Sequence, residues 1–340
     1  MNSVSTIGLA FNPYNGFYTN EVERYNAKKM EKATQLIKLA LENNSYKVIL
    51  LPIDEFFLSK TLNQKPDLIF NYSTGIIEKN SQAISTGLLE KTGIPFTGSE
   101  LKTHVIALYK DLSKYVFKTN GIPTPNFQVL DKPNEIKKTL LNYPLFVKPL
   151  HEGSSFGVDD RSVVHNIKGL NEKSAEIIRN YRQPALIEEF IPGKEYTVGI
   201  WGNYEPELLP ILELRFNNKD NINTREVKNK RAMEELCPAS IEINIEKAIK
   251  KIAIKAYKML GCLDYARMDF RVDPEGRVYL IEINSLPSLK PDRSSFIKMC
   301  RAKNIDFDAA IKRIVDISIQ RWGLEKINTR QKKIYELESQ

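Results

Sequence analysis

Cysteine and histidine are both scarce in this chain, which has 340 residues and three of each. Cys237, Cys262 and Cys300 lie far apart, with no CxxC pair and no spacing that suits zinc. The three histidines form no metal-binding pattern either, so each is expected to be a surface or hydrogen-bonded polar residue. These absences exclude a zinc ribbon and a disulfide-rich scaffold, and they favour a chain that stays reduced.

Long hydrophobic runs are also missing from the sequence. No segment reaches roughly 18 uninterrupted apolar residues, which is the length that a membrane-spanning helix needs. The apolar stretch at residues 4–11 is short and follows no basic region, unlike a secretory signal. No collagen-like period or extended low-complexity tract is present. We therefore expect a globular, cytoplasmic protein with no membrane partner.

The charge balance is moderately basic, because 50 Lys and Arg residues stand against 42 Asp and Glu residues, a net charge of +8. The basic residues are spread along the chain without a long block. This distribution favours small phosphates over nucleic acid as ligands. The expected partners are therefore small molecules.

Alternating strand and helix patterns at the start of the chain predict an open α/β domain with parallel strand pairing. A change of rhythm near residue 98 predicts the first domain boundary, and a long helix is expected at 101–119. The expected strands are at 4–11, 47–51, 67–71 and 94–97, and the expected helices are at 20–44 and 81–92.

The remainder of the chain predicts two further units. A small α+β unit contains an expected helix at 134–141 and a strand at 185–189. The last unit contains an antiparallel strand pair, a strand hairpin and a long polar segment at 217–235, a length typical of functional lids. The predicted domains are residues 1–97, 98–189 and 190–340.

The first informative cluster is a short apolar strand that ends at Lys148 and continues into a loop of small residues. Such a loop can direct one lysine and several backbone N–H groups at phosphate oxygens without a Walker motif. An ordinary turn with a surface lysine has the same appearance when taken alone. The loop consists of Glu152, Gly153, Ser154, Ser155, Phe156 and Gly157.

The second cluster lies on the predicted hairpin. Side chains alternate along a strand, so Arg267 and Asp269 share one face, and Glu282 and Asn284 share one face of the neighbouring strand. Two carboxylates and an amide oxygen suit magnesium, and the arginine can stabilise charge on a transferred phosphoryl group. A solvated sheet face would show the same alternation.

The third cluster covers residues 186–195, where a buried strand leads into an acceptor-rich segment. Its carboxylates can accept hydrogen bonds from a ribose or an adenine edge, while Phe190 and Ile191 can contact a flat base. The cluster is weak evidence alone and gains weight from its place between the other two.

Taken together and in this order, the clusters resemble the ATP-grasp superfamily, most closely the D-alanine–D-alanine ligases. The resemblance covers residues 94–310, about two thirds of the chain, and implies a three-domain α/β protein with α+β architecture in the ATP-grasp part. It rests on the motifs at 95–99, 121–125, 147–149, 152–157, 266–269 and 282–287.

The resemblance implies roles for individual residues, with ATP and Mg²⁺, or Mn²⁺ in its place, as cofactors. Lys110 and Lys148 would contact the ATP phosphates, and the small-residue loop with Glu152 would cover them. Residues expected to line the adenosine site are Glu188, Phe190, Ile191 and Glu195, and those expected to bind the metal are Asp269, Glu282 and Asn284.

In these ligases a carboxylate attacks the γ-phosphate of ATP, and an amine then attacks the acyl phosphate to form an amide. The resemblance implies that Arg267 stabilises the acyl phosphate and the tetrahedral intermediate. Glu21 is the match to an amino-terminal glutamate, Ser154 to a loop serine and Lys228 to a lid lysine. The implied assembly is a homodimer formed through the amino-terminal domain.

The substrate side departs from the ligase pattern. Asn229 follows Lys228 where the ligases carry a tyrosine, and Ser288 replaces a glycine after the proline of the last motif. Residues 70–75 stand where the ligases carry a histidine-glycine segment. The pattern keeps the ATP machinery and alters amino-acid recognition.

The leading hypothesis is an ATP-dependent ligase that joins two amino acids or short peptides, with D-alanine as the first substrate to test. A second hypothesis keeps this chemistry but uses another substrate pair, as in ligases of secondary metabolism. Lys290 and Arg293 could then bind an acidic or longer substrate, or simply be exposed charges. A non-catalytic ATP-binding sensor is the third hypothesis, and the intact charged residues of the hairpin argue against it.

Overall fold

The structure is a computed structural model that describes residues 3–13, 21–73, 81–133, 136–151, 157–216, 218, 220–224, 226 and 233–326; within the first helix, the side chains of residues 21–30 are not described. Its helices are α1 (Glu21–Asn43), α2 (Phe57–Gln64), α3 (Ser81–Thr92), α4 (Leu101–Leu108), α5 (Lys110–Thr119), α6 (Ile167–Tyr181), α8 (Ile243–Leu260), α9 (Ser295–Ala302) and α10 (Phe307–Arg321). Its strands are β1 (Ser3–Val4), β2 (Thr6–Phe11), β3 (Lys47–Pro52), β4 (Leu68–Asn71), β5 (Phe127–Leu130), β6 (Leu145–Pro149), β7 (Val163–Val164), β8 (Ala185–Glu189), β9 (Lys194–Trp201), β10 (Glu207–Leu208), β11 (Leu212–Phe216), β12 (Met233–Leu236), β13 (Tyr265–Val272), β14 (Val278–Asn284) and β15 (Glu325–Lys326).

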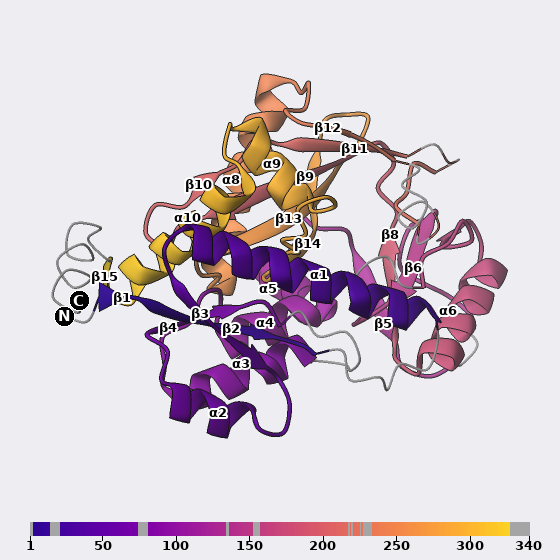
Figure 1. Cartoon of the computed structure of the whole chain (residues 1–340). Helices are drawn as coiled ribbons and strands as arrows, with labels where there is room; N and C mark the ends of the chain where they lie inside the picture. The colour runs from indigo at the N-terminus through magenta and orange to yellow at the C-terminus, as the bar shows by residue number, and fades with distance from the viewer. Residues whose placement is uncertain are drawn as a thin grey trace, which may run out of the picture.

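The first sheet is parallel, with the strand order β3-β2-β4, and confirms the predicted open α/β arrangement (Figure 1). Fully buried Leu9 and Phe70 from this sheet belong to one core with Ile37 and Leu41 of α1. The same core continues into α10, so the last long helix packs against α1 although the two are far apart in sequence. The expected strand at 94–97 is reduced to a single bridge between Ile69 and Phe96.

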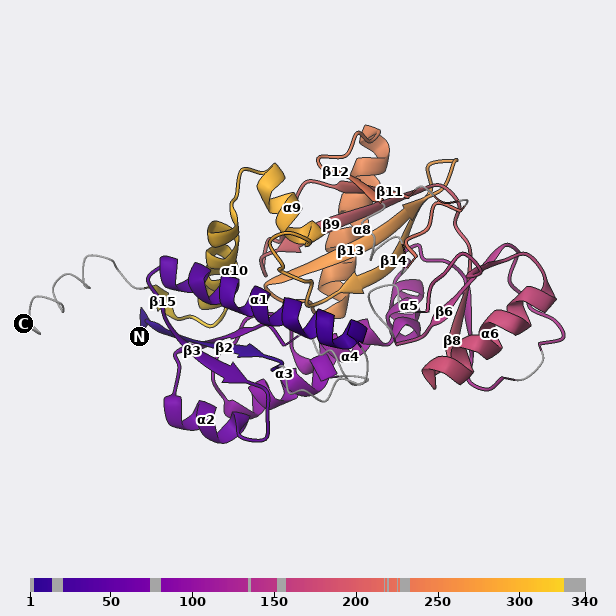
Figure 2. The same ribbon diagram turned by 45° about the vertical axis from the view of Figure 1, so that its right-hand side comes forward.

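The second sheet is antiparallel, with the order β5-β8-β6-β7, and α6 packs against it (Figure 2). Leu145, Val147 and Ile187 from its strands form a buried core with Leu170 and Ile177 of α6. The helical period of α6 places its apolar side chains on one face, which is why the helix covers the sheet. This small unit carries Lys148 of the first sequence cluster and Glu188 of the third.

The third sheet has the order β12-β11-β9-β13-β14, with β10 also paired to β9. All of its pairings are antiparallel. Met268 and Phe270 of β13 are fully buried against α8, in a core that includes Ala253 and Tyr257. Polar residues alternate with these apolar ones along β13, so they lie on the opposite face of the sheet.

Asp264 links the first and third sheets. This fully buried carboxylate accepts hydrogen bonds from the backbone N–H of Gly98 (2.8 Å) and from the guanidinium of Arg321 (2.9 and 3.0 Å). Arg321 also donates to the carbonyl of Phe96. The end of α10 is therefore fastened to the segment that leaves the first sheet.

The expected helix at 134–141 is wrong, because residues 136–141 are not helical. The backbone N–H and carbonyl of Ile136 bond instead to the side chain of Asn171 on α6, at 2.8 and 3.1 Å. Leu140 is 91% exposed, so a helix here would have buried little apolar surface.

The long helix expected at 101–119 is broken into α4 and α5 at Tyr109, which has an extended backbone (φ −86°, ψ 95°). The ring of Tyr109 contacts the ring of His151, with 4.3 Å between centroids. The break turns α5 so that Lys110, Lys114 and Phe117 face inward and are buried. Within the described residues, no helix is long and apolar enough to cross a membrane.

Candidate active site

Three neighbouring strands of the third sheet bring polar side chains to one face. The strand register places Arg267 opposite Asn284 and Asp269 opposite Glu282, as the predicted hairpin requires. On the other side of β13, Asp269 lies opposite Thr197 of β9. Thr197 is a residue that sequence reasoning missed, because only the pairing of β9 with β13 brings it to this face.

A β-bulge between Asp269 and Phe270 adjusts this hairpin. Beyond the bulge, Phe270 pairs with Leu280 instead of Ile281, so one extra residue sits on β14. The shift lets Leu280 reach the core, where it is fully buried, while Glu282 keeps its place on the polar face. Bulges next to functional sites redirect side chains in this way.

Asp269 is surrounded by hydrogen-bond donors. Arg267 donates to both of its carboxylate oxygens, from Nε at 3.0 Å and from Nη2 at 2.8 Å. Thr197 Oγ1 donates at 2.6 Å and Asn284 Nδ2 at 3.1 Å. Burial lowers the pKa of Arg267, but Asp269 and then Glu282 raise it above its ordinary value, so the guanidinium stays charged.

The donor set on this face suits magnesium. Within the described residues, no group of three or more His, Cys, Asp or Glu side chains could hold a metal ion by itself. Asp269, Glu282 and Asn284 supply two carboxylates and one amide oxygen, which are hard ligands. Magnesium commonly takes only one or two protein carboxylates and completes its shell with water and substrate phosphates. The residues therefore fit the ion as part of a nucleotide site.

A buried ion cluster lies in the second sheet. Glu188 of β8 forms ion pairs with Lys114 of α5 and, at 2.6 Å, with Lys148 of β6. The three side chains are 4%, 0% and 8% exposed, respectively. Burial alone would raise the pKa of Glu188, but the charges and hydrogen bonds of the two lysines outweigh it and lower the pKa to about 2.

Glu282 connects the ion cluster with the polar face of the third sheet. Burial lowers the pKa of Lys148, but Glu188 and then Glu282 raise it above its ordinary value. The charge of Glu282 acts on Lys114 in the same direction. The two lysines and Glu282 of the hairpin thus share one electrostatic environment, as a site for phosphate and a divalent cation requires.

Lys114 is the principal residue of the ion cluster that sequence reasoning missed. It lies one helical turn after Lys110, so the two lysines share a face of α5, and this spacing is the signal that could have found it. The Nζ of Lys114 also donates to Thr124 Oγ1 at 2.9 Å. The Nζ of Lys110 lies 3.5 Å from the carbonyl of Leu150 at the end of β6.

The segment between β8 and β9 follows the ion cluster directly. The rings of Phe190 and Phe146 are stacked with 6.4 Å between centroids, and the guanidinium of Arg271 lies 5.1 Å from the centre of the Phe190 ring. Burial raises the pKa of Glu195 to about 7; Arg271 opposes this shift, and Asp269 and Glu282 add to it.

Gly157 closes the small-residue loop in a conformation that needs glycine. Its φ is +73°, and a Cβ there would lie 2.4 Å from the side chain of Pro149. The other residues of the loop, 152–156, lie outside the described residues, as do Lys228 and Asn229. Glu21 begins α1, and its side chain is not described.

The chain that follows Asn284 contacts α3 and α4 through Ser285. The hydroxyl of Ser285 lies 2.7 Å from His104 Nδ1, and Gln82 Nε2 lies 2.8 Å from the same nitrogen. Lys290 is half-buried and Arg293 is exposed in the loop that leads to α9.

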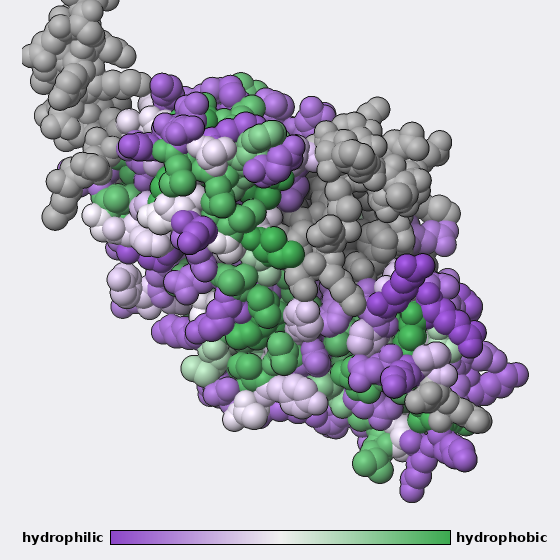
Figure 3. Space-filling model, turned by 90° about the horizontal axis from the view of Figure 1, so that it is seen from below, coloured by the Kyte–Doolittle hydropathy of each residue, from purple (hydrophilic) through white to green (hydrophobic). Residues whose placement is uncertain are grey.

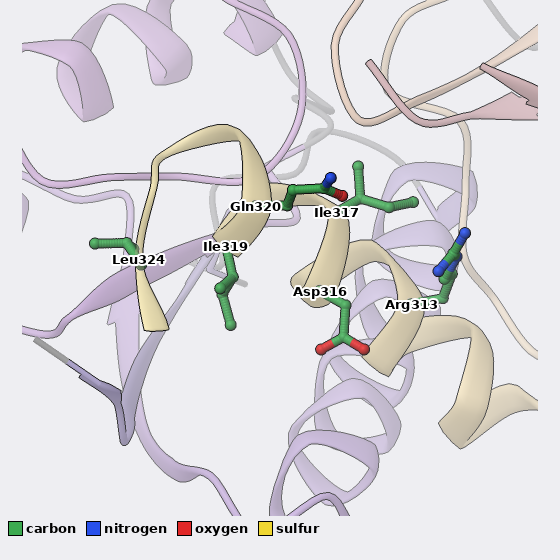
Figure 4. Close-up of a pocket in the computed structure, with 6 residues that line it drawn as sticks. All are labelled: Arg313, Asp316, Ile317, Ile319, Gln320 and Leu324. Carbon is green, nitrogen blue, oxygen red and sulfur yellow. The ribbon is translucent and has the colours of Figure 1, made fainter. Parts of the chain in front are cut away.

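A pocket of about 270 Å³ lies along α10 and is lined by none of the predicted site residues (Figure 4). Its lining is mixed, with a carboxylate and a guanidinium among aliphatic side chains. The residues that line it are Arg313, Asp316, Ile317, Ile319, Gln320 and Leu324.

Three sheets in this order, with a lysine-glutamate cluster facing a carboxylate hairpin, define the ATP-grasp class. The fold matches the crystal structure of D-alanine–D-alanine ligase from Bacillus anthracis complexed with ATP, with a TM-score of 0.74 and 22% sequence identity. The match covers 93% of this chain and 98% of that one.

Sequence comparison defines the family. Residues 116–316 match the model of the D-ala D-ala ligase C-terminus. The chain is 31% identical to the D-alanine–D-alanine ligase of Sphingopyxis alaskensis over 284 residues, covering 82% of this chain and 89% of that one. An uncharacterized Sinorhizobium fredii protein is 31% identical over 279 residues, 81% of this chain and 82% of its own. The chain belongs to the D-alanine–D-alanine ligase family of ATP-grasp enzymes.

Proposed function

We propose that the protein uses ATP to activate the carboxylate of one amino acid and joins it to the amine of a second, with D-alanine as both substrates. The observation that carries this proposal is the shared environment of two clusters. The ion cluster of Lys114, Lys148 and Glu188 lies within electrostatic reach of Glu282 on the carboxylate hairpin. Such a site can hold a phosphate chain and a divalent cation together.

The ion cluster is proposed to bind the ATP phosphates. Lys148 is the residue expected from the sequence, and the buried position of Lys114 beside the same carboxylate adds a second cation. Lys110, Glu152 and the small-residue loop through Gly157 keep their proposed place around the phosphates. Because both lysines of the cluster are fixed by Glu188, they need little rearrangement to meet phosphate oxygens.

The proposed adenosine site is the segment from Glu188 to Glu195. Phe190 and Ile191 are partly exposed and can contact a flat base, while the Glu195 carboxylate can accept hydrogen bonds from ribose hydroxyls.

The proposed metal ligands are Asp269, Glu282 and Asn284. A magnesium ion held there supplies electrostatic stabilisation of the phosphate charge. The bidentate pair with Asp269 fixes the guanidinium of Arg267 on the same face. We assign Arg267 the stabilisation of the acyl phosphate and of the tetrahedral oxyanion.

Substrate recognition is proposed from sequence positions. Glu21, Ser154 and Lys228 keep the catalytic roles that the family pattern implies. Asn229 replaces the lid tyrosine, so the set around Ser154 must lose one phenolic hydroxyl. Exposed Arg293 and half-buried Lys290 near the hairpin favour, as the second candidate, a substrate with an additional carboxylate.

The test is phosphate release from ATP and magnesium with a panel of single and paired D- and L-amino acids, together with mass spectrometry of the products. We expect release with D-alanine alone and a product with the mass of D-alanyl-D-alanine. Release only with another pair selects the second candidate. The absence of phosphate release with every pair would contradict the ligase assignment.

We propose a homodimer formed through the face that carries α2 and α3. Seen from below, hydrophobic side chains form a continuous band on this side of the molecule (Figure 3). Phe56, Leu62 and Ile84 are 55%, 50% and 53% exposed on or next to these helices. Sedimentation equilibrium tests the proposal, and a monomer at micromolar concentration would contradict it.

Because the reaction consumes ATP, we propose that the protein acts in the cytoplasm.

A further inference from the structure

Three charged side chains lie on the polar face of β13: Arg267, Asp269 and Arg271. The proposed chemistry does not use Arg271. Its guanidinium donates to three backbone carbonyls in two separate segments. Nε donates to Ile191 O at 2.6 Å, and Nη2 donates to Gly193 O at 3.1 Å. Nη1 donates to Asn221 O at 3.0 Å. Its side chain is 7% exposed.

The carbonyls of Ile191 and Gly193 belong to the linker that joins the second sheet to the third, which we call the β8–β9 linker (residues 190–193). Gly193 lies directly against β13: its φ is +110°, and a Cβ there would lie 2.2 Å from the carbonyl of Val272. Asn221 donates to the same Gly193 carbonyl at 2.8 Å and accepts from Phe216 N–H at 3.0 Å. The linker is therefore held against β13 by close backbone contact and by the side chains of Arg271 and Asn221.

Arg271 also contacts two of the side chains proposed for the adenosine site. It lies opposite Glu195 in the register of β9 and β13, and its Nη1 is 3.3 Å from Glu195 Oε2. Its guanidinium lies over the Phe190 ring at 5.1 Å. Besides Arg271, the charges that act on the Glu195 carboxylate are those of Asp269 and Glu282, which raise its pKa, and of Lys148, which lowers it.

We propose that Arg271 is a positioning residue for the adenosine half of ATP: it fixes the β8–β9 linker and orients Glu195 toward the ribose. This inference rests on the proposed function, because it assumes that the adenosine lies against the linker. Arginine suits the task, since its planar fork reaches several acceptors at once and lysine cannot. The phosphate half is held separately, by the lysines of the ion cluster.

The experiment measures equilibrium binding of three probes by calorimetry in the presence of magnesium: ATP, 2′,3′-dideoxy-ATP and inorganic tripolyphosphate. The variants are R271M, R271K and the control R277M. Arg277 lies on the turn of the same hairpin, is 66% exposed and pairs with Asp273 and Glu275. We expect R271M to weaken ATP about tenfold and to leave tripolyphosphate within about twofold, because only the adenosine contacts change.

Two further readouts separate positioning from a general structural effect. The preference for ATP over the dideoxy analogue should fall about fivefold in R271M, because Glu195 no longer faces the ribose hydroxyls. R271K restores the charge but not the fork, so its ATP affinity should stay reduced. R277M should match the wild type in every measurement.

The inference is overturned by an R271M variant that binds ATP within about twofold of wild type, or that loses ATP and tripolyphosphate equally. If R271M does not fold, N221A replaces it, because it removes the side-chain bonds of Asn221 to Gly193 and Phe216 and keeps Arg271. A loss of about threefold for ATP alone supports the inference, and equal losses for ATP and tripolyphosphate, or none, overturn it. Wild-type protein that binds ATP without ligating amino acids contradicts the proposed reaction only, whereas a failure to bind ATP contradicts both proposals.

Discussion

Arg267 engages both carboxylate oxygens of Asp269, two residues further along β13. The pair is partly buried, with 22% of the arginine side chain and 14% of the aspartate side chain exposed. A bidentate pair of this kind fixes direction as well as distance. The guanidinium is thereby held on the face that carries Glu282 and Asn284, which is where phosphate chemistry would need a stationary positive charge.

The metal assignment predicts the behaviour of Glu282→Gln. The substitution removes one charge at nearly constant volume, so we expect kcat to fall by about 100-fold or more while the thermal unfolding temperature stays close to wild type. Phosphate release and circular dichroism give the two readings. Glu275→Gln is the matched control, because Glu275 is exposed on the turn of the same hairpin. Full magnesium-dependent activity in Glu282→Gln would show that this carboxylate is not a ligand.

The ion cluster predicts which lysine of α5 matters most for phosphate binding. Lys114 shares Glu188 with Lys148, whereas the Lys110 amine lies beside the Leu150 carbonyl. We therefore expect K114M to lower kcat/KM for ATP by about 100-fold and K110M to lower it less. Steady-state kinetics with varied ATP measures both. A larger loss in K110M would show that Lys110, the α5 lysine expected from the sequence, matters more for phosphate binding than Lys114.

Glu188 is also expected to be important for stability. Removing it leaves two buried ammonium groups without their ion-pair partner, and breaking a buried pair in this way costs about 3–5 kcal/mol. We expect E188Q to lose that amount in urea unfolding, while E189Q, a half-buried neighbour on the same strand, loses less than about 1 kcal/mol. The double variant K114M/E188Q should lose less than the sum of the single variants. Additive losses would mean that the charges do not interact.

Buried His104 predicts how stability depends on pH. Burial lowers its pKa from 6.5 to about 4, with a backbone hydrogen bond to Ser99 opposing the shift. Between these values the unfolded chain binds a proton that the folded chain does not, so stability falls as the pH falls from 6.5 to 4. The loss amounts to roughly 3 kcal/mol. We measure the free energy of unfolding in urea as a function of pH for wild type and H104Q. The two curves should converge as the pH falls from 6.5 to 4, and parallel curves would contradict the lowered pKa of His104.

Local sequence patterns were sufficient to predict much of the fold. The bounds predicted for β8 agree with the structure, because buried apolar runs flanked by Pro and Gly define a strand without help from distant residues. Likewise, alternation along β13 and β14 placed the hairpin side chains on one face. Helix α2 was missed, since it is only eight residues long and buries only Phe57 and Thr61.

The remaining features depend on contacts between distant segments. The break at Tyr109 is accompanied by a ring contact with His151, and residues 136–141 are held by Asn171. Two further sets of contacts join separate elements. Arg271 donates hydrogen bonds to the β8–β9 linker, and Lys114 and Lys148 both form ion pairs with Glu188. Propensity and spacing carry no information about such pairings. The site residues implied by the family pattern and the domain limits predicted from the sequence stay predictions.

The proposed reaction transfers phosphate from ATP to a carboxylate before the amide bond forms. The most direct test supplies D-alanine labelled with ¹⁸O in its carboxylate and analyses the released phosphate by mass spectrometry. In this account the labelled oxygen bonds to phosphorus and leaves with the phosphate, so each turnover yields one ¹⁸O in phosphate together with ADP. Unlabelled phosphate, or AMP and pyrophosphate as products, would contradict it.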